Sequence, residues 1–182
     1  MLSQKLNLSS QKMQHSIKNQ SFYLQDVTVD FGSIQGLRNV QLSVANGEVL
    51  FITGASGAGK TTLLKVLSGL IKPTKGKLIE HDKSHSFKAL VFQDLKLMEK
   101  LSLRENLYLS YDAQIYKNMK AFEKDLDNLS SLFGIKDRLD RLPSRANGGL
   151  KQKVAIIRSL LSKPDIFIAD EPTSSLDFDN AS

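Results

Sequence analysis

The sequence predicts an α/β fold in which an antiparallel β-layer precedes a core with buried parallel strands. Three observations predict it. Polar and apolar residues alternate as in a strand over Phe22–Val29. A glycine-rich octet, Gly54–Thr61, stands between an apolar run and a helical pattern. A second apolar run, Ile166–Ala169, ends in Asp170 and Glu171.

The composition is that of a globular protein. Its 182 residues are 41% hydrophobic and 24% charged, and no apolar run approaches the roughly 20 residues that span a bilayer. The N-terminus lacks the apolar stretch of a secretory signal, so none is expected. The absence of cysteine excludes disulfides and thiolate metal sites, and it fits a cytosolic protein.

The formal net charge is +6, and half of it comes from Lys5, Lys12 and Lys18 in a segment, residues 1–25, without Asp or Glu. The remaining charge is too small to argue for a nucleic-acid partner, so none is expected. We expect residues 1–21 to form a flexible tail. Weak contact of this tail with an anionic membrane face is the alternative.

The first layer is expected to contain two strands and a turn. Val40–Val44 alternates like Phe22–Val29, and Asn46-Gly47 is a strong turn signal. Further strands are predicted over Lys77–Ile79 and Lys88–Phe92.

The octet reads Gly54, Ala55, Ser56, Gly57, Ala58, Gly59, Lys60, Thr61 and fits G-x-x-x-x-G-K-[ST]. Val49–Ile52 before it suits a buried parallel strand, and Thr61–Leu67 after it suits a helix that stops at Gly69. Strand, glycine loop and helix form the context that this motif requires.

This loop is predicted to hold the phosphates of ATP or GTP. Glycines let backbone amides point inward, and the following helix adds the positive end of its dipole. Lys60 supplies a mobile positive charge for the β- and γ-phosphates, and the Thr61 hydroxyl suits Mg²⁺. An ordinary glycine-rich turn with an incidental lysine is the alternative.

Residues 95–150 change character and are expected to form an inserted helical subdomain. Lys117–Phe133 is a charged amphipathic pattern that ends at Gly134. A further helix begins at Leu150 and ends at Lys163-Pro164. Its apolar residues fall on one face, with Lys151 and Arg158 off it: Leu150, Val154, Ile157 and Leu161.

The two carboxylates after Ile166–Ala169 are the natural second half of a phosphate site. Ligands of open α/β sheets bind at the carboxyl ends of the strands. Asp170 can hold the water shell of Mg²⁺, and Glu171 can take a proton from an attacking water. A solvated acidic turn is the alternative.

From Phe22 to Asp177 the sequence resembles the nucleotide-binding domain of ABC ATPases. The resemblance implies a P-loop NTPase core of ABC type over residues 22–182, with an antiparallel β-subdomain and the helical insertion. Phe31 stands where the family stacks an aromatic on adenine, and Val91–Asp94 looks like its Gln loop. Asp165–Pro172 looks like its Walker B segment, and Ser174–Asp177 like its D-loop.

The resemblance also implies a function. Two copies would sandwich two ATP molecules head to tail, as a homodimer. Each nucleotide would contact Phe31, Gly54–Thr62 and Asp177 and, from the other copy, Asn147-Gly148-Gly149. Gln93, Thr61 and Asp170 would contact Mg²⁺. Glu171 would be the catalytic base, assisted by Gln93, which would also sense an integral membrane partner.

Within the family, Phe92–Asp94 followed by Glu105-Asn106 is most similar to the group of the cell-division ATPase FtsE and the lipoprotein-release and MacB-type ATPases. This implies a cytoplasmic protein, peripheral on the inner face of the cell membrane. In an FtsE-like system the membrane partner would be FtsX-like.

Three departures from the family pattern bear on activity. The signature segment reads Ala146-Asn147-Gly148-Gly149-Leu150 instead of Leu-Ser-Gly-Gly-Gln, and Lys153 replaces the usual Arg. The stretch from Gly76 to Gln93 is short. No histidine follows His85, and the sequence given stops at Ser182, so the switch histidine and later core strands are missing. We expect a fragment of a longer reading frame, truncated at the C-terminus; a decayed protein is the alternative.

Two other functions remain open at this stage. The altered signature and missing histidine suit a nucleotide-gated switch with little or no hydrolysis. A small-molecule P-loop kinase explains the glycine loop, but it does not explain Asn147-Gly148-Gly149, Asp170-Glu171 and Ser174–Asp177 together.

Overall fold

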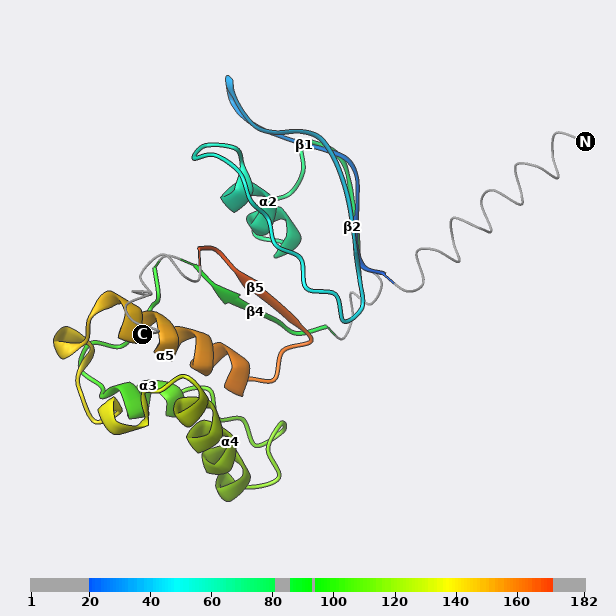
Figure 1. Ribbon diagram of the computed structural model, residues 1–182. Coiled ribbons are helices and arrows are strands. Elements are labelled where there is room, and N and C mark those ends of the chain that lie inside the picture. The colour runs from blue at the N-terminus through cyan, green and yellow to red at the C-terminus, as the bar shows by residue number, and fades with distance from the viewer. Residues whose placement is uncertain (1–19, 81–85, 93, 172–182) are drawn as a thin grey trace, which may run out of the picture. The chain divides into compact units, whose positions relative to one another are not determined.

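The computed structural model describes residues 20–80, 86–92 and 94–171. The chain divides into two compact units, an N-terminal unit of residues 1–86 and a C-terminal unit of residues 87–182, and each is described by itself (Figure 1). The tail expected over residues 1–21 lies almost wholly outside the described residues.

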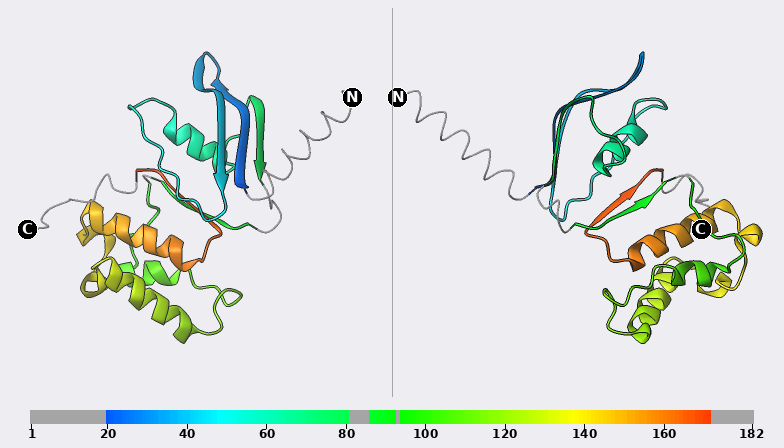
Figure 2. Two further views of the ribbon diagram at one scale, coloured as in Figure 1. Left: turned by 45° about the vertical axis from the view of Figure 1, so that its right-hand side comes forward. Right: turned by 180° about the vertical axis from the view of Figure 1, so that it is seen from behind.

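The N-terminal unit is built on a three-stranded antiparallel sheet of order β2-β1-β3 (Figure 2). Its strands are β1 (Gln20–Phe31), β2 (Ile34–Ala45) and β3 (Lys75–Glu80). Leu24 pairs with Leu42 on one side and with Leu78 on the other. The predicted antiparallel β-layer is therefore present, with one face of β1 buried. Helix α2 (Lys60–Leu67) begins at Lys60, within the glycine octet, and is followed by a turn at Gly69, whose φ is 82°.

The strand predicted over Val49–Ile52 is wrong in this structure. These residues are in no strand, and the side chains of Val49 and Phe51 are 76% and 84% exposed. A strand exists only where a neighbour completes its ladder of hydrogen bonds. In the described part of the N-terminal unit, β2 and β3 each pair with β1, and no described strand pairs with Val49–Ile52.

The C-terminal unit combines a parallel strand pair with helices. Strands β4 (Lys88–Val91) and β5 (Ile166–Ala169) pair in parallel, as expected for buried apolar runs of an α/β core. The helical elements are α3 (Leu103–Tyr108), α4 (Met119–Leu132), η1 (Lys136–Arg138), η2 (Pro143–Arg145) and α5 (Gly148–Leu161). The termination of α4 near Gly134, where φ is 65°, agrees with the prediction.

Helix α5 is the centre of this unit. Its predicted apolar face is buried in one cluster with side chains of α3 and α4. The helix is also buried on a second face, where Ala155 and Ile156 pack with Val91 of β4. Two packed faces explain why the prediction of a single buried face was too simple. In the view from behind in Figure 2, α5 separates the strand pair from the other helices of this unit.

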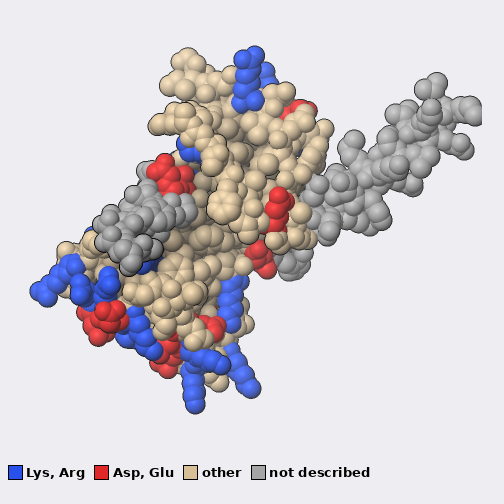
Figure 3. Space-filling view, viewed as in Figure 1, with Lys and Arg blue, Asp and Glu red and all other residues tan. Residues whose placement is uncertain are grey.

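The surface of the helical part carries charges of both signs (Figure 3). Ion pairs such as Lys136–Asp127 and Lys163–Asp125 interleave them. Among the described residues, no helix is long and apolar enough to cross a membrane.

Candidate functional site

The phosphate loop of the N-terminal unit is shaped by a close backbone contact. Gly59 has φ 88°, and a Cβ there would lie 2.5 Å from the carbonyl oxygen of Gly36 in β2. Only glycine fits this approach, because a side chain would clash with backbone and would favour negative φ. Strand β2 therefore supports the loop where the loop becomes α2.

Lys60 folds over its own loop. Its Nζ donates to the carbonyl oxygens of Gly54 and Ala55, at 2.8 and 2.9 Å. The N-cap of α2, Gly59, makes no side-chain cap hydrogen bond, and the first turn contains no acidic residue. A helix N-terminus without a side-chain cap, beside an ammonium group, is a suitable environment for an anion.

Phe31 lies against the same structure. A Cβ at Gly36 would lie 2.7 Å from Cε2 of Phe31 and 3.3 Å from Cγ2 of Thr62. The Phe31 ring and the first turn of α2 thus meet over Gly36, and the ring remains 49% exposed. The structure brings together Phe31, the octet and Thr62, all of which the sequence assigned to nucleotide binding.

The two carboxylates of the C-terminal unit stand at the end of β5. Val91 pairs with Ala169, and the next backbone N–H, that of Asp170, donates to the Val91 carbonyl oxygen at 2.9 Å. Asp170 is only 6% exposed, whereas Glu171 is exposed. Adjacent carboxylates therefore occupy different environments.

Glu171 has an unusual backbone. Its φ is 48°, in the left-handed region that non-glycine residues seldom adopt. Nε2 of Gln152 in α5 donates to its carbonyl oxygen at 2.8 Å. The turn that follows β5 is therefore attached to the helix that begins at the signature segment.

The signature segment forms the start of α5. Asn147 is the N-cap, and its Oδ1 accepts from the backbone N–H of Leu150 at 2.9 Å. Gly148 and Gly149 form the first turn. Leu150, the departure from the family's Gln, is buried in the helical core. Lys153, the departure from Arg, donates to the carbonyl oxygen of Phe133 at the end of α4.

Gln93 and Asp177 lie outside the described residues. The segment after Gln93 is described, and Arg158 of α5 holds it. Its guanidinium donates to the carbonyl oxygens of Leu95 and Lys96, at 2.7 and 2.9 Å. Burial lowers the pKa of Arg158 from its usual value, although the group stays charged at neutral pH.

The donor chemistry fits a magnesium ion that arrives with a nucleotide. Within the described ranges no cluster of three or more His, Cys, Asp or Glu could hold a metal by itself. Mg²⁺ commonly takes one or two protein oxygens and completes its octahedron with water and phosphate. The hydroxyl of Thr61 in the N-terminal unit and the carboxylate of Asp170 in the C-terminal unit are each oxygens of this kind.

Comparison with known proteins decides the family. The profile of the ABC transporter family matches residues 37–174, most of the chain.

The chain belongs to the ABC transporter family of ATP-binding proteins.

Its relatives include a protein named as a hemin import ATP-binding protein, HrtA, of Staphylococcus haemolyticus. It is 36% identical over 174 residues, 87% of this chain and 78% of that protein. The lipoprotein-releasing system ATP-binding protein LolD of Bacteroides fragilis is 33% identical over 171 residues, 87% and 79% of the two chains. The solved dimer of the ATP-binding cassette MJ0796, in a post-hydrolysis state with ADP and Pi, has a TM-score of 0.70 and 29% identity, and the match covers 86% of this chain and 76% of that one.

Membership of the ABC family confirms several predictions. The fold is that of an ABC ATPase with an antiparallel β-subdomain and helical parts. The chain is an ABC ATPase, with ATP and Mg²⁺ as its nucleotide and metal. ABC cassettes dimerise and pair with membrane permease subunits.

Two side-chain contacts beside the predicted site residues were not predicted from the sequence, those of Gln152 and Arg158. Arg158 was assigned only to the side of the helix away from the core, and Gln152 was not singled out. Both contact backbone carbonyls of residues distant in sequence, so no local pattern could reveal them. The one available signal was Gln152 itself, a polar residue that the helical pattern of α5 does not require to be exposed.

Proposed function

We propose that this ABC protein hydrolyses ATP as a head-to-tail homodimer and transmits the resulting motion to an integral membrane partner. Each ATP would contact Phe31 and Gly54–Thr62 of one copy and Asn147-Gly148-Gly149 of the other. Asp177 would contact the nucleotide as part of the crossing loop. The head-to-tail arrangement accounts for phosphate-binding features at two separate helix N-termini, those of α2 and α5.

In this proposal Glu171 accepts the proton of the water that attacks the γ-phosphorus, with Gln93 orienting that water. Lys60 and the loop amides hold the negative charge that develops on the phosphoryl oxygens. Mg²⁺, held through Thr61, Asp170 and Gln93, would supply further positive charge there.

One observation carries the assignment of roles: the unequal exposure of Asp170 and Glu171. A buried carboxylate that is fixed through its backbone to β4 suits a constant electrostatic role. An exposed neighbour can reach water, as a base must.

The test is turnover of Glu171→Gln, in which the amide keeps the shape but cannot accept the proton. Phosphate release should fall by roughly 10² to 10⁴, the usual scale of a general base, while Mg-ATP binding persists. Lys60→Ala is the control, because it should lose binding itself. Wild-type turnover in Glu171→Gln would remove Glu171 from this role.

The same assay separates hydrolysis from a nucleotide-gated switch. A switch would bind Mg-ATP at saturation without releasing phosphate. The departures at Asn147 and Leu150 motivate this second candidate, since both alter the signature segment. The hydrolysis proposal requires continuous phosphate release above the rate of the Lys60→Ala variant.

We further propose an FtsE-like role in cell division, with an FtsX-like membrane protein as partner and a peripheral position on the inner face of the cell membrane. An exporter of the lipoprotein-release or MacB type is the second candidate, which the similarity to LolD favours. To distinguish the two candidates, the membrane protein encoded beside this chain would be co-expressed with it and isolated by its binding to this chain. If the isolated pair restores division in cells that lack an FtsX-like partner, the FtsE-like role is supported. If the pair instead releases lipoprotein from membranes, the exporter role is supported.

A further inference from the structure

We infer that Gln152 is a positioning residue for Glu171: its side-chain amide fixes the turn after β5 and thereby the direction of the catalytic carboxylate. The inference rests on the proposed role of Glu171. It concerns a side chain of α5 that lies outside the signature segment.

The two peptide groups around Asp170 and Glu171 are held by different elements. The N–H of Asp170 donates to the Val91 carbonyl oxygen of β4, as if β5 continued for one more residue. The carbonyl of Glu171 leaves that ladder and accepts from Gln152 of α5 at 2.8 Å. The chain therefore turns away from the sheet between these two hydrogen bonds.

The turn is a left-handed one. Glu171 has φ 48°, which costs a side-chain-bearing residue energy and persists only when its surroundings fix it. In an extended conformation, successive side chains would alternate strictly across the strand. The left-handed residue breaks the alternation, so the hydrogen bond that selects this conformation also selects where the carboxylate points.

Gln152 is well placed to be rigid. It is 5% exposed, in a helix whose neighbouring residues Ala155 and Ile156 pack with Val91. A buried amide donor held by its helix has few alternative rotamers, and its loss would leave the Glu171 carbonyl without this donor. The hydrogen bond from Gln152 therefore holds the turn at Glu171 at a set distance from α5.

The test is a double-mutant cycle between Gln152→Met and Glu171→Gln, read as phosphate release at saturating Mg-ATP. Methionine keeps the length and volume of glutamine but donates no hydrogen bond. Gln152→Met should lower kcat by roughly 10- to 100-fold, since misplacing a catalytic group by about 1 Å has an effect of that size. KM for ATP should stay within about 2-fold, because the phosphate loop is untouched. In the Glu171→Gln background the same substitution should have no further effect.

Two variants complete the design. Tyr116→Phe removes another buried side-chain hydrogen bond to a carbonyl of α5, that from Tyr116 to Leu161 at 2.7 Å, and should leave kcat unchanged. Gln152→Asn keeps an amide that is too short to reach Glu171, and it should reproduce the loss if Gln152→Met does not fold.

The outcomes separate this inference from the proposed function. Unchanged kcat in folded Gln152→Met or Gln152→Asn, with Glu171→Gln impaired, overturns the inference and leaves Glu171 as the base. Equal, multiplicative losses in both backgrounds also overturn it, because they indicate a general structural role. Normal turnover in Glu171→Gln contradicts the proposed function itself.

Discussion

Asn147 can cap a helix with its carbonyl oxygen and donate to a phosphate with its amide nitrogen, whereas a serine must do both with one hydroxyl. Its Oδ1 caps α5 by accepting from Leu150, and in the described part of the chain its Nδ2 donates to no acceptor. The amide therefore retains two donors for a phosphate while the cap is made. The altered signature residue is compatible with nucleotide contact at the N-terminus of α5.

Substitutions at Asn147 can separate the cap from the phosphate contact. Asp caps a helix as well as Asn does, but it presents a carboxylate where the amide donors were. Asn147→Asp should keep thermal stability and lower phosphate release at least about 10-fold by like-charge repulsion. Asn147→Ser, measured in parallel, should keep both. If Asn147→Asp hydrolyses ATP normally, Asn147 does not contact the phosphate.

At the residue scale the sequence predicted what short motifs encode. Glycines, Lys60 and the paired carboxylates stand in fixed local spacing, so the pattern alone predicts their chemistry. The contact of Phe31 with Gly36 and that of Gln152 with Glu171 depend on how strands and helices pack. No spacing rule contains that information.

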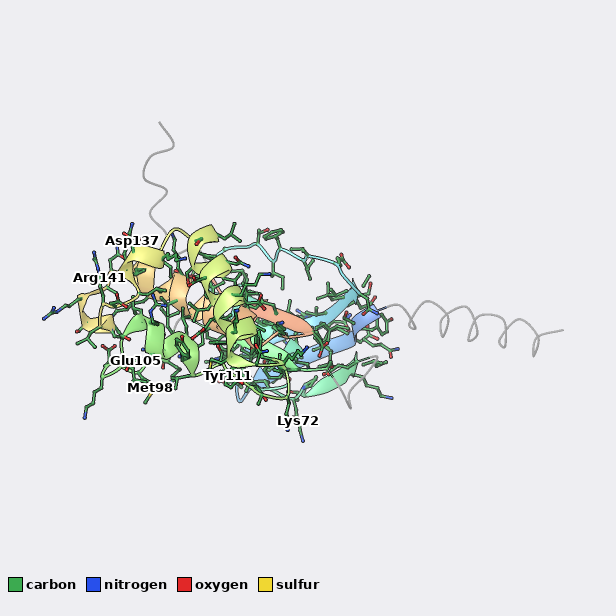
Figure 4. All side chains as sticks on the ribbon, turned by 90° about the horizontal axis from the view of Figure 1, so that it is seen from below. Lys72, Met98, Glu105, Tyr111, Asp137 and Arg141 are labelled. Atoms are coloured by element: carbon green, nitrogen blue, oxygen red, sulfur yellow. The ribbon has the colours of Figure 1, made fainter. Side chains whose placement is uncertain are left out.

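At the element scale, α3 shows how a short helix is stabilised. Ser102 Oγ accepts from the Glu105 N–H, and Glu105 Oε2 accepts from the Ser102 N–H, a capping box. Asn106 donates to Met98 and Leu101, fixing the segment before the helix. Figure 4 draws the side chains and labels Met98, at the start of this segment, and Glu105 of the capping box.

The capping box predicts a pH dependence of stability. The Ser102 backbone N–H, and then its hydroxyl, hold the pKa of Glu105 below its usual value. A lowered carboxyl pKa gives stability that is present above the unfolded-state pKa and lost as pH falls through the folded one. Wild type should therefore exceed Glu105→Gln in Tm at pH 7, and the difference should shrink as the pH falls and the Glu105 carboxylate becomes protonated in the folded state. A difference that is constant with pH in thermal unfolding contradicts this.

Loss of the cap itself should be visible at neutral pH. Ser102→Ala removes the acceptor of the Glu105 N–H, which should cost about 0.5–2 kcal/mol. For a chain of this length that corresponds to a Tm lower by roughly 1–8 °C. Ser144→Ala, an exposed serine of η2, is the matched control and should leave Tm nearly unchanged.

Elements with their own periodicity were predictable, and those that need a neighbour were not. The pattern of Lys117–Phe133 contains its amphipathic face and its glycine stop, and α4 forms there. Val49–Ile52 has the composition of a central strand, yet a central strand needs partners on both sides. Composition shows that a segment is able to form a strand, and the presence of pairing partners decides whether the strand forms.

At the scale of the whole molecule, the proposed head-to-tail sandwich predicts assembly that depends on nucleotide. Glu171→Gln should shift from monomer to dimer in Mg-ATP, because bound ATP would be retained between two copies. Lys60→Ala should remain monomeric at every ATP concentration. Light scattering after size exclusion measures both. A dimer of equal stability without nucleotide would contradict the sandwich arrangement.

In the proposed nucleotide site, the close backbone approach of Gly36 and Gly59 would make adenine recognition and phosphate recognition depend on each other. Any side chain gained at position 36 displaces the Phe31 ring, and any gained at position 59 displaces the strand that carries position 36. A substitution that changed base preference at the Phe31–Gly36 contact would therefore also disturb binding of the triphosphate by the loop at Gly59. Neither glycine would need to touch the nucleotide to restrict which nucleotides the proposed site accepts.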